Sequence, residues 1–544
     1  MEILNIEKLS FKYPSNNTFA LKDISFKLNA GDFLLLAGES GCGKTTLLKL
    51  IKKEISPNGN LKGIIKIKSE SLYNVGYILQ NPDNQIVTEK VYSELAFGLE
   101  NLGVNAEVME RKIGEMATYF GIEDLLFKPT DSLSGGQKQL INLASILIMN
   151  PKILLLDEPT AQLDPIATTN FLSTLKRIND DFGITIIIAE HNLEEIYSLV
   201  NKVAILKNGN LLCFGTPENT AVKLFSSKDK YFIDSLPSPL KLCGELNFKE
   251  YPLTINEGKK FLTTNFNKSI FKREIKQSSD KVILEFKDVY FRYTKNSDDI
   301  LAECNLKINQ GEIFSLLGGN GTGKTTLLNI ALGFLNPYYG NVFFDGNNLK
   351  KYKNNTLYKN NIAFLPQNPE TIWTEATLID DFKKLLCTTD INKDEWDNII
   401  LNQMANFNLK EELLYRHPYD LSAGEQQKAA LIKILFQNPK LLLLDEPSKA
   451  LDANAKNELK LLLKNLSNKN ITILMVTHDI EFAAEISDRS ALFFNKKVVG
   501  VSNSNDFFNN NTFYTTAACR MSNNLFDGAI TYKEVLSCCK NQIK

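Results

Sequence analysis

Short apolar runs alternate along the chain with segments whose apolar residues recur at helical spacing. The runs 32–37, 152–156 and 184–189 have the length and the leucine- or isoleucine-rich character of buried strands. The segment 137–149 instead carries apolar side chains along one helical face, at Leu140, Leu143, Ala144, Leu147 and Ile148. This alternation is typical of βα units, and it predicts an α/β fold whose mostly parallel sheet is covered on both faces.

The same order of features occurs twice in the chain. Lys324 follows Lys44 by 280 positions, and Gln367 follows Gln80 by 287 positions. The second copy therefore holds a short insertion, which we place around 347–361. Self-similarity over such a length indicates two domains of one ancestry.

We expect the first domain to cover 1–225 and the second domain to cover 281–515. The intervening segment 226–280 is polar and contains scattered prolines and charges. It is predicted to be a linker with one short helix near 255–263. A C-terminal tail, 516–544, follows the second domain.

Composition is ordinary for a soluble globular protein, with 43% apolar and 23% charged residues among 544. The net charge of −1 and the pI near 6.4 give no electrostatic case for nucleic-acid binding. No apolar run reaches the roughly 18 residues of a membrane span, and the N-terminus does not resemble a secretory signal. The eight cysteines show no metal-ligand spacing, so we expect a cytosolic protein with reduced thiols.

Each copy contains a glycine-rich loop between an apolar strand and an apolar helix. Such a loop curls its backbone N–H groups around nucleotide phosphates, while its lysine reaches the β and γ phosphates and its threonine binds Mg²⁺. The predicted nucleotide-binding residues of the first loop are Gly38, Glu39, Ser40, Gly41, Cys42, Gly43, Lys44, Thr45 and Thr46. Those of the second loop are Gly318, Gly319, Asn320, Gly321, Thr322, Gly323, Lys324, Thr325 and Thr326. The chain is therefore predicted to bind nucleoside triphosphate twice.

Paired carboxylates end an apolar strand in both copies, at Asp157 and Glu158 and at Asp445 and Glu446. Ligands of parallel sheets bind at the carboxyl ends of the strands. We therefore expect the aspartates to hold Mg²⁺ and the glutamates to orient or polarise an attacking water. An ordinary polar strand end does not explain the same Asp-Glu-Pro sequence in both copies.

Two of the three histidines, His191 and His478, lie just past apolar strands at matching places. An imidazole there can hydrogen-bond the γ-phosphate and hold the attacking water. Gln80 and Gln367 also end strands at matching places. We expect these glutamines to bind Mg²⁺ or the water and to report the nucleotide state outward.

Two further pairs of motifs flank these residues. Tyr13 and Tyr293 precede the phosphate loops, where an aromatic ring can stack on adenine; packing at a strand edge is the alternative. The segments 133–137 and 421–425 each open a helix, whose free N–H groups and dipole make an anion site. The expected ligands there are Ser134, Gly135, Gly136, Gln137, Ser422, Ala423, Gly424 and Glu425. A second anion site per copy suggests a nucleotide that belongs to the other copy.

With these motifs, and with the loops 161–164 and 449–452, the chain resembles the ATP-binding-cassette (ABC) ATPases over nearly all of both copies. The resemblance implies two tandem P-loop NTPase domains, each with a mostly parallel sheet and flanking helices, an antiparallel β subdomain and a helical signature subdomain. It also implies that two cassettes sandwich two ATP molecules. The composite sites would pair Lys44 with Ser422 and Gly424, and Lys324 with Ser134 and Gly136.

A narrower resemblance rests on the segments 80–87 and 94–101, which look like the ATPases of energy-coupling-factor transporters for cobalt and vitamins. The segment 367–373 resembles the fused two-cassette members of that class. The resemblance implies import, docking on an integral-membrane scaffold subunit that holds a small-molecule-binding membrane subunit, and a place at the cytoplasmic face of the membrane.

The second signature departs from the family pattern, because Ala423 and Glu425 replace glycine and glutamine. Ser422 and Gly424 remain, and the glutamates of both Asp-Glu pairs are present. We expect both sites to hydrolyse ATP, with no requirement for equal rates.

Three other classes of protein can be compared with this pattern. A double cassette acting on the ribosome would favour a strongly charged linker and a basic surface. A sugar-importer ATPase typically carries a degraded phosphate loop in one half, whereas Lys44 and Lys324 are both followed by threonine. Both classes stay as alternatives. A DNA-maintenance ATPase is excluded, because the stretch from Lys44 to Ser134 is too short for its long coiled coil.

Overall fold

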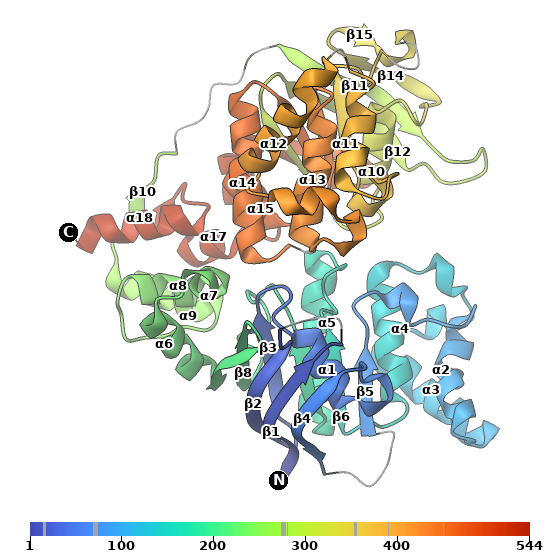
Figure 1. The fold of residues 1–544 in the computed structure, drawn as a ribbon, viewed down its shortest axis with the longest axis vertical. Coiled ribbons are helices and arrows are strands. Elements are labelled where there is room, and N and C mark those ends of the chain that lie inside the picture. Colours follow the sequence, from blue (N-terminus) through green and yellow to red (C-terminus); the bar gives the residue numbers. More distant parts are fainter. Residues whose placement is uncertain are drawn as a thin grey trace. The chain divides into compact units, whose positions relative to one another are not determined.

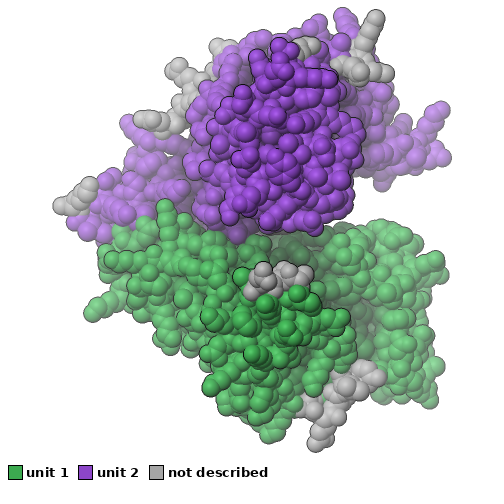
Figure 2. All heavy atoms as spheres, in the orientation of Figure 1, with its two compact units in different colours: residues 1–258 green, residues 259–544 purple. Residues whose placement is uncertain are grey.

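The computed structural model describes residues 1–14, 18–68, 74–273, 279, 281–352, 356–389, 391–449 and 451–543. They form two compact units, Met1–Gly258 and Lys259–Lys544, which Figure 2 colours separately. Each unit holds one copy of the repeat. Parts of the predicted insertion (353–355), of the predicted linker (274–278 and 280) and of the loop 449–452 (Ala450) lie outside the described residues.

The strands of the first unit are β1 (Glu2–Lys12), β2 (Leu21–Asn29), β3 (Phe33–Gly38), β4 (Asn60–Ile67), β5 (Val75–Ile78), β6 (Ile153–Asp157), β7 (Thr185–Ala189), β8 (Lys202–Lys207) and β9 (Asn210–Gly215). One sheet has the order β5-β6-β7-β3-β8-β9, parallel except for β9. The other is antiparallel, in the order β2-β1-β4. The parallel sheet thus brings the ends of β3, β6 and β7 to one edge, where the predicted site residues follow.

The helices of the first unit are α1 (Lys44–Ile51), α2 (Val91–Asn101), α3 (Ala106–Phe120), α4 (Gly135–Leu147), α5 (Pro165–Phe182), α6 (Pro217–Ser227), α7 (Lys230–Ser235) and α8 (Ser238–Glu245). Single 3-10 turns are η1 (Lys53–Ile55), η3 (Pro82–Asn84), η4 (Glu123–Leu125) and η5 (Thr130–Ser132). Helices α2, α3 and α4 share a core of their own, and this is the helical subdomain expected around the signature.

The second unit repeats the plan (Figure 1). Its strands are β10 (Ser269–Ile270), β11 (Val282–Phe291), β12 (Leu301–Asn309), β13 (Ile313–Leu317), β14 (Tyr339–Phe344), β15 (Asn347–Asn348), β16 (Ile362–Leu365), β17 (Leu441–Asp445), β18 (Thr472–Thr477), β19 (Arg489–Phe494), β20 (Lys497–Asn503) and β21 (Phe526–Asp527). The mostly parallel sheet has the order β16-β17-β18-β13-β19-β20, and the antiparallel sheet has the order β12-β11-β14-β15. The predicted α/β fold with two cassettes is confirmed.

The helices of the second unit are α9 (Ile255–Asn265), which crosses the boundary between the units, α10 (Lys324–Ala331), α11 (Leu378–Leu386), α12 (Trp396–Asn406), α13 (Ala423–Leu435), α14 (Ala453–Asn468), α15 (Ile480–Ile486), α16 (Ser504–Asn510), α17 (Ala517–Ser522) and α18 (Tyr532–Ile543). The 3-10 turns are η6 (Leu349–Lys351), η7 (Pro369–Ile372), η8 (Lys393–Glu395), η9 (Glu411–Tyr415) and η10 (Pro418–Asp420).

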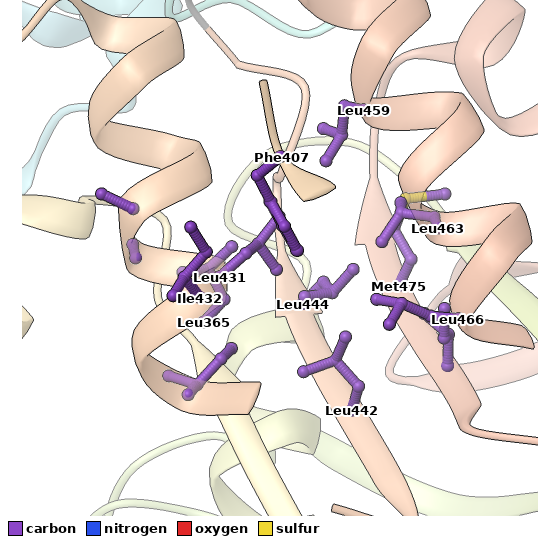
Figure 3. Close-up of a cluster of buried hydrophobic side chains, with 14 of the residues drawn as sticks. Leu365, Phe407, Leu431, Ile432, Leu442, Leu444, Leu459, Leu463, Leu466 and Met475 are labelled. Atoms are coloured by element: carbon purple, nitrogen blue, oxygen red, sulfur yellow. The ribbon is translucent and has the colours of Figure 1, made fainter. Parts of the chain in front are cut away.

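Each central strand buries both of its faces. In β17, Leu442 and Leu444 pack among helices, whereas Leu441 and Leu443 belong to the core that includes the antiparallel sheet. Figure 3 shows side chains of α13 and α14 that approach Leu442 and Leu444, namely Leu431, Ile432, Leu459, Leu463 and Leu466. Because successive side chains of a strand point to opposite faces, an uninterrupted leucine run is what a sheet covered on both sides requires.

The segment predicted to be a linker holds more helix than its sequence pattern indicates. Phe232 of α7 and Leu240 of α8 are buried in the core of the first unit, and the Glu194 carboxylate accepts a hydrogen bond from the N–H of Ser238 at 3.0 Å. Farther along, β10 pairs in parallel with β21 of the tail. The domain boundaries stay a prediction, but 226–245 is packed protein rather than a tether.

The connection from Phe344 to Ile362 in the second unit is longer than the equivalent connection from Ile67 to Val75 in the first unit. This agrees with the insertion expected around 347–361. Among the described residues, every helix is too short or too polar to span a lipid bilayer.

Candidate active sites

Both phosphate loops join the end of a buried strand to the start of a helix. β3 leads into α1 and β13 leads into α10, with Gly43 and Gly323 as the residues before each helix. Gly43 has a φ of 104°, and a Cβ there would lie 2.6 Å from the carbonyl oxygen of Ala20. Only glycine fits this turn, which leaves the backbone N–H groups of the loop and of the helix start available to an anion.

The lysine of each loop is buried and held across it. Lys44 Nζ donates to the carbonyl oxygens of Gly38 and Glu39, at 3.0 Å each. Lys324 Nζ does the same with Gly318 and Gly319, at 3.0 and 2.7 Å. Each ammonium is therefore held over its loop, and the resulting positive charge suits the phosphates of a nucleotide.

The threonine after each lysine contacts the aspartate that ends the neighbouring strand. Thr45 Oγ1 donates to Asp157 Oδ1 at 3.0 Å, and Thr325 Oγ1 donates to Asp445 Oδ2 at 2.8 Å. Burial raises the pKa of both aspartates above the ordinary range, and the threonine bonds oppose that rise. Hydroxyl and carboxylate oxygens are the ligands that Mg²⁺ prefers, so these residues fit a Mg²⁺ ion at each loop.

The two glutamates lie beside the two histidines. His191 Nε2 is 2.6 Å from Glu158 Oε1, and His478 Nδ1 is 2.8 Å from Glu446 Oε2. Burial alone would raise the pKa of each glutamate, but the adjacent histidine and the charge of the loop lysine outweigh it and lower the pKa below its usual value. Both glutamates are therefore ionised at neutral pH, as an acceptor for a water proton must be.

An uncommon backbone conformation sets the direction of these two glutamate side chains. Glu158 and Glu446 have φ values of 48° and 50°, in the left-handed region that non-glycine residues seldom adopt. Their N–H groups still donate to the next strand, at Ala189 O and Val476 O. The chain thus turns sharply where the strand ends, a feature that recurs at functional sites.

The glutamines differ between the units. Gln80 Nε2 donates to Glu158 Oε2 at 2.9 Å. In the described part of the chain, no hydrogen bond joins Gln367 to Glu446. The structure therefore brings Gln80, Glu158 and His191 together, and in the second unit only Glu446 and His478.

The tyrosines lie against the first turn of the loop helices. The hydroxyl of Tyr13 is 3.0 Å from Thr46 Oγ1, and that of Tyr293 is 3.1 Å from Thr326 Oγ1. Each ring also makes an edge contact with the phenylalanine two residues earlier. The rings are thus fixed beside the phosphate loops, and their stacking on adenine stays a prediction.

Each signature begins a helix with a reciprocal cap. The Ser134 hydroxyl accepts from the N–H of Gln137 while the Gln137 side chain accepts from the N–H of Ser134, and Ser422 and Glu425 do the same. Glu425 therefore keeps the cap that glutamine would make. A Cβ at Gly135 would have only Gln162 O at 4.0 Å as a neighbour, which explains why alanine is accepted at 423.

Three neighbours of the predicted site residues were not predicted to contribute to the sites. The Tyr77 hydroxyl donates to Asp157 Oδ2 at 3.0 Å. Glu190, next to His191, is buried and accepts from Thr160. In the second unit the Lys449 ammonium lies near the Asp445 and Glu446 carboxylates, which oppose the lowering of its pKa by burial. Only Glu190 carries a sequence signal, as a polar residue at the end of β7, whereas Tyr77 lies within β5 and Lys449 lies in the loop 449–452.

The family model described as ABC transporter matches residues 21–161 and 301–449, one match in each unit. A Bacillus thuringiensis subsp. konkukian (strain 97-27) protein with the name "Putative ABC transporter ATP-binding protein" is 39% identical over 552 residues, which cover 99% of this chain and 98% of that protein. A similarly named protein of Clostridium perfringens (strain 13 / Type A) is 29% identical, with coverages of 98% and 96%.

Two solved structures are also similar. One is cbiO1 from Clostridium perfringens, part of the ABC transporter complex cbiONQ, with 30% identity, a TM-score of 0.39, and coverage of 45% of this chain and 98% of that chain. The other is the archaeal ribosome recycling factor aABCE1, with 19% identity, a TM-score of 0.60 and coverage of 92% and 91%; at this identity the likeness shows the fold alone. The family matches, the full-length relatives and the duplicated residue sets show that this chain belongs to the ABC transporter family, as a double-cassette ATPase.

Proposed function

We propose that this double-cassette ATPase energises an importer of the energy-coupling-factor class, for a vitamin or for cobalt or another metal ion. In this proposal the chain lies at the cytoplasmic face of the membrane. It docks on an integral-membrane scaffold subunit, which holds a small-molecule-binding membrane subunit. The observation that carries the proposal is the segment after Gln80, whose sequence resembles that class.

The structure supports a docking role for this segment. Val87 is 64% exposed, but hydrogen bonds to a buried side chain hold the loop that carries it. The buried Glu94 carboxylate accepts from the N–H groups of Val87 and Thr88, at 3.1 and 2.9 Å, and from the Thr88 hydroxyl. An apolar side chain on a loop of fixed shape suits a partner's apolar surface, because little ordering entropy is lost on docking.

Nearby, Phe127 is 77% exposed and stacks on Tyr92 at 6.2 Å between ring centroids. The N–H of Tyr92 donates to Leu126 O, so this aromatic pair is tied to the start of α2. We assign Val87 and Phe127 to the surface that receives an apolar segment of the scaffold subunit.

Purification of the tagged chain from its native membranes in detergent, followed by mass spectrometry, tests this assignment. Small polytopic membrane proteins should co-purify, and Val87→Asp should lower their yield about tenfold, since an unpaired carboxylate would be buried on docking. Leu61→Asp, at a half-exposed leucine of β4, is the matched control. Co-sedimentation with ribosomal subunits instead would favour the ribosome-acting alternative, and a bound sugar would favour the sugar-importer alternative.

For the chemistry, we propose that ATP binding closes the two cassettes on each other. One ATP would then lie between Lys44 and the signature of Ser422 and Gly424, and the other between Lys324 and the signature of Ser134 and Gly136. Hydrolysis would place ADP and phosphate together and reopen the pair by charge repulsion.

In the first site, Glu158 would orient the attacking water and accept its proton, with His191 holding the glutamate in place. Lys44 and the loop N–H groups would stabilise the charge that develops on the transferred phosphoryl group. Mg²⁺, held by Thr45 and Asp157, would neutralise phosphate charge. The phosphoryl group passes directly to water, so trapping of a phosphorylated enzyme would contradict this chemistry.

Separate Glu158→Gln and Glu446→Gln variants test whether both sites hydrolyse ATP. In each variant, the rate of ATP hydrolysis at the substituted site should fall at least about tenfold. If one of them keeps the full wild-type rate, the corresponding site does not contribute and the two-site proposal is wrong.

A further inference from the structure

We propose that Glu190 is a positioning residue of the first ATP site only. Its buried side chain ties the turn that follows Glu158 to the strand end that carries His191, so that hydrolysis at this site depends on it. This inference rests on the proposed role of Glu158 in hydrolysis.

The geometry is specific. Glu190 is 4% exposed and follows the last residue of β7. Its Oε1 atom accepts two hydrogen bonds from Thr160, from the backbone N–H at 3.1 Å and from the hydroxyl at 2.7 Å. Thr160 lies two residues after Glu158, whose own backbone bonds to Ala189. Glu158 is therefore enclosed between two links from the strand that precedes His191.

The turn is also held from its other side. Gln139 of the signature helix donates to the carbonyl oxygen of Pro159 at 3.1 Å. A displacement of Thr160 would thus move the turn that joins Glu158 to the loop 161–164 and to the Asp164 cap of α5.

The second unit is built differently at the matching positions. Thr477 stands in place of Glu190, and its hydroxyl accepts from the N–H of Asp479 at 3.0 Å. Ser448 stands in place of Thr160. The Gln427 bond to Pro447 O, at 3.0 Å, matches the Gln139 bond of the first unit, so this bond is common to both units, whereas the link through Glu190 belongs to the first.

The link does not need a negative charge. Burial raises the pKa of Glu190 to about 8, and the Thr160 bonds oppose that rise while the Glu158 carboxylate adds to it. At neutral pH the side chain is therefore a neutral acid whose carbonyl oxygen accepts from Thr160. A glutamine has the same shape and the same acceptor, whereas a threonine is too short to reach.

The test measures single-turnover cleavage of Mg-ATP by the full chain in two backgrounds. In Glu446→Gln, where only the first site keeps its glutamate, Glu190→Thr should slow cleavage about tenfold or more. The affinity of the Glu190→Thr variant for ATP should differ from that of its parent by less than about twofold. The Glu190→Gln variant, in the same background, should cleave ATP within about twofold of the parent rate. In Glu158→Gln, Glu190→Thr should leave second-site cleavage within about twofold of its parent.

Thr477→Val, in the Glu158→Gln background, is the matched change in the second site and should slow cleavage by less than about threefold. Thr160→Ala removes one of the two donors and should slow ATP cleavage at the first site by about threefold. This variant tests the link if Glu190→Thr does not fold. Equal slowing of both backgrounds, no slowing of the first, or failure of glutamine to rescue would each overturn the inference. A wrong assignment of Glu158 would give a different result, because Glu158→Gln itself would then leave ATP cleavage at the first site intact.

Discussion

The two candidate ATP sites share their main residues and differ in the neighbours of those residues. Asp157 accepts from both Thr45 and Tyr77, whereas Phe364 replaces the tyrosine in the second unit. Glu190 adds a neutral acid to the first site, and Lys449 adds a cation to the second. Because pKa values and transition-state charge depend on such neighbours, equal rates at the two sites are not expected.

His191→Ala tests the pairing with Glu158. Without the histidine, burial of Glu158 is no longer offset, so the pKa of Glu158 should rise. In the Glu446→Gln background, the acid limb of the pH–rate profile should move to higher pH, besides a lower maximal rate. His417→Ala, at the exposed third histidine, is the control and should leave the profile in place. An unmoved acid limb in the first variant would show that His191 does not set the pKa of Glu158.

Glu190→Gln should change stability in a pH-dependent way. The folded-state pKa of Glu190, about 8, lies above the value of about 4.3 for a free glutamate. The stability that Glu190 contributes is therefore fully present below the lower value and is lost as pH rises toward the higher one, because the unfolded chain ionises first. The Tm of Glu190→Gln minus that of the wild type should become more positive between about pH 5 and pH 8.

Differential scanning calorimetry measures this difference. Glu100→Gln, at an exposed position of α2, should show no such trend. A difference between Glu190→Gln and the wild type that stays constant over the same pH range would mean that Glu190 is ionised in the folded protein.

Sequence reasoning found residues whose chemistry repeats and missed those whose role comes from burial. Lys44, Asp157 and His191 stand at recurring places, so the duplication itself exposes them. Glu190 has no repeated partner, and a glutamate at a strand end normally faces water. Its burial against Thr160 becomes visible only once β6 and β7 are paired.

At the scale of elements, alternation of apolar runs and helical stripes sufficed to predict the parallel sheets. β6 and β17 are apolar strands with both faces buried, one against helices and the other in the core that includes the antiparallel sheet. Helices α7 and α8 were missed, because they are too short for a helical period to stand out and are stabilised by burial rather than by intrinsic propensity.

Leu240→Ala tests the packing of α8 in the first unit. Leu240 is fully buried in the main core, so the truncation should lower the free energy of unfolding of this unit by about 2–5 kcal/mol. Urea unfolding followed by circular dichroism measures it, with Leu61→Ala, half-exposed on β4, as a control expected within about 0.5 kcal/mol of the wild type. Equal effects of the two substitutions would mean that 226–245 is a tether after all.

At the scale of the whole molecule, the chain carries two units, each with a phosphate loop, a Mg²⁺-compatible aspartate, a glutamate–histidine pair and a capped signature helix. We predict each signature to be a second anion site in a unit that already has a phosphate loop. If the halves share nucleotides, as we propose, every one of these parts has a use, and ATP occupancy would control the surfaces that we propose to dock on a membrane partner.

The most direct test of this account is an experimental structure of the Glu158→Gln, Glu446→Gln double variant with saturating Mg-ATP, in which hydrolysis cannot clear the sites. Two ATP molecules should be bound, and the Ser422 hydroxyl should lie within hydrogen-bonding distance of the ATP held by Lys44, as Ser134 should for the ATP held by Lys324. ATP bound at both lysines while each serine stays remote from the nucleotide of the other half would contradict the account.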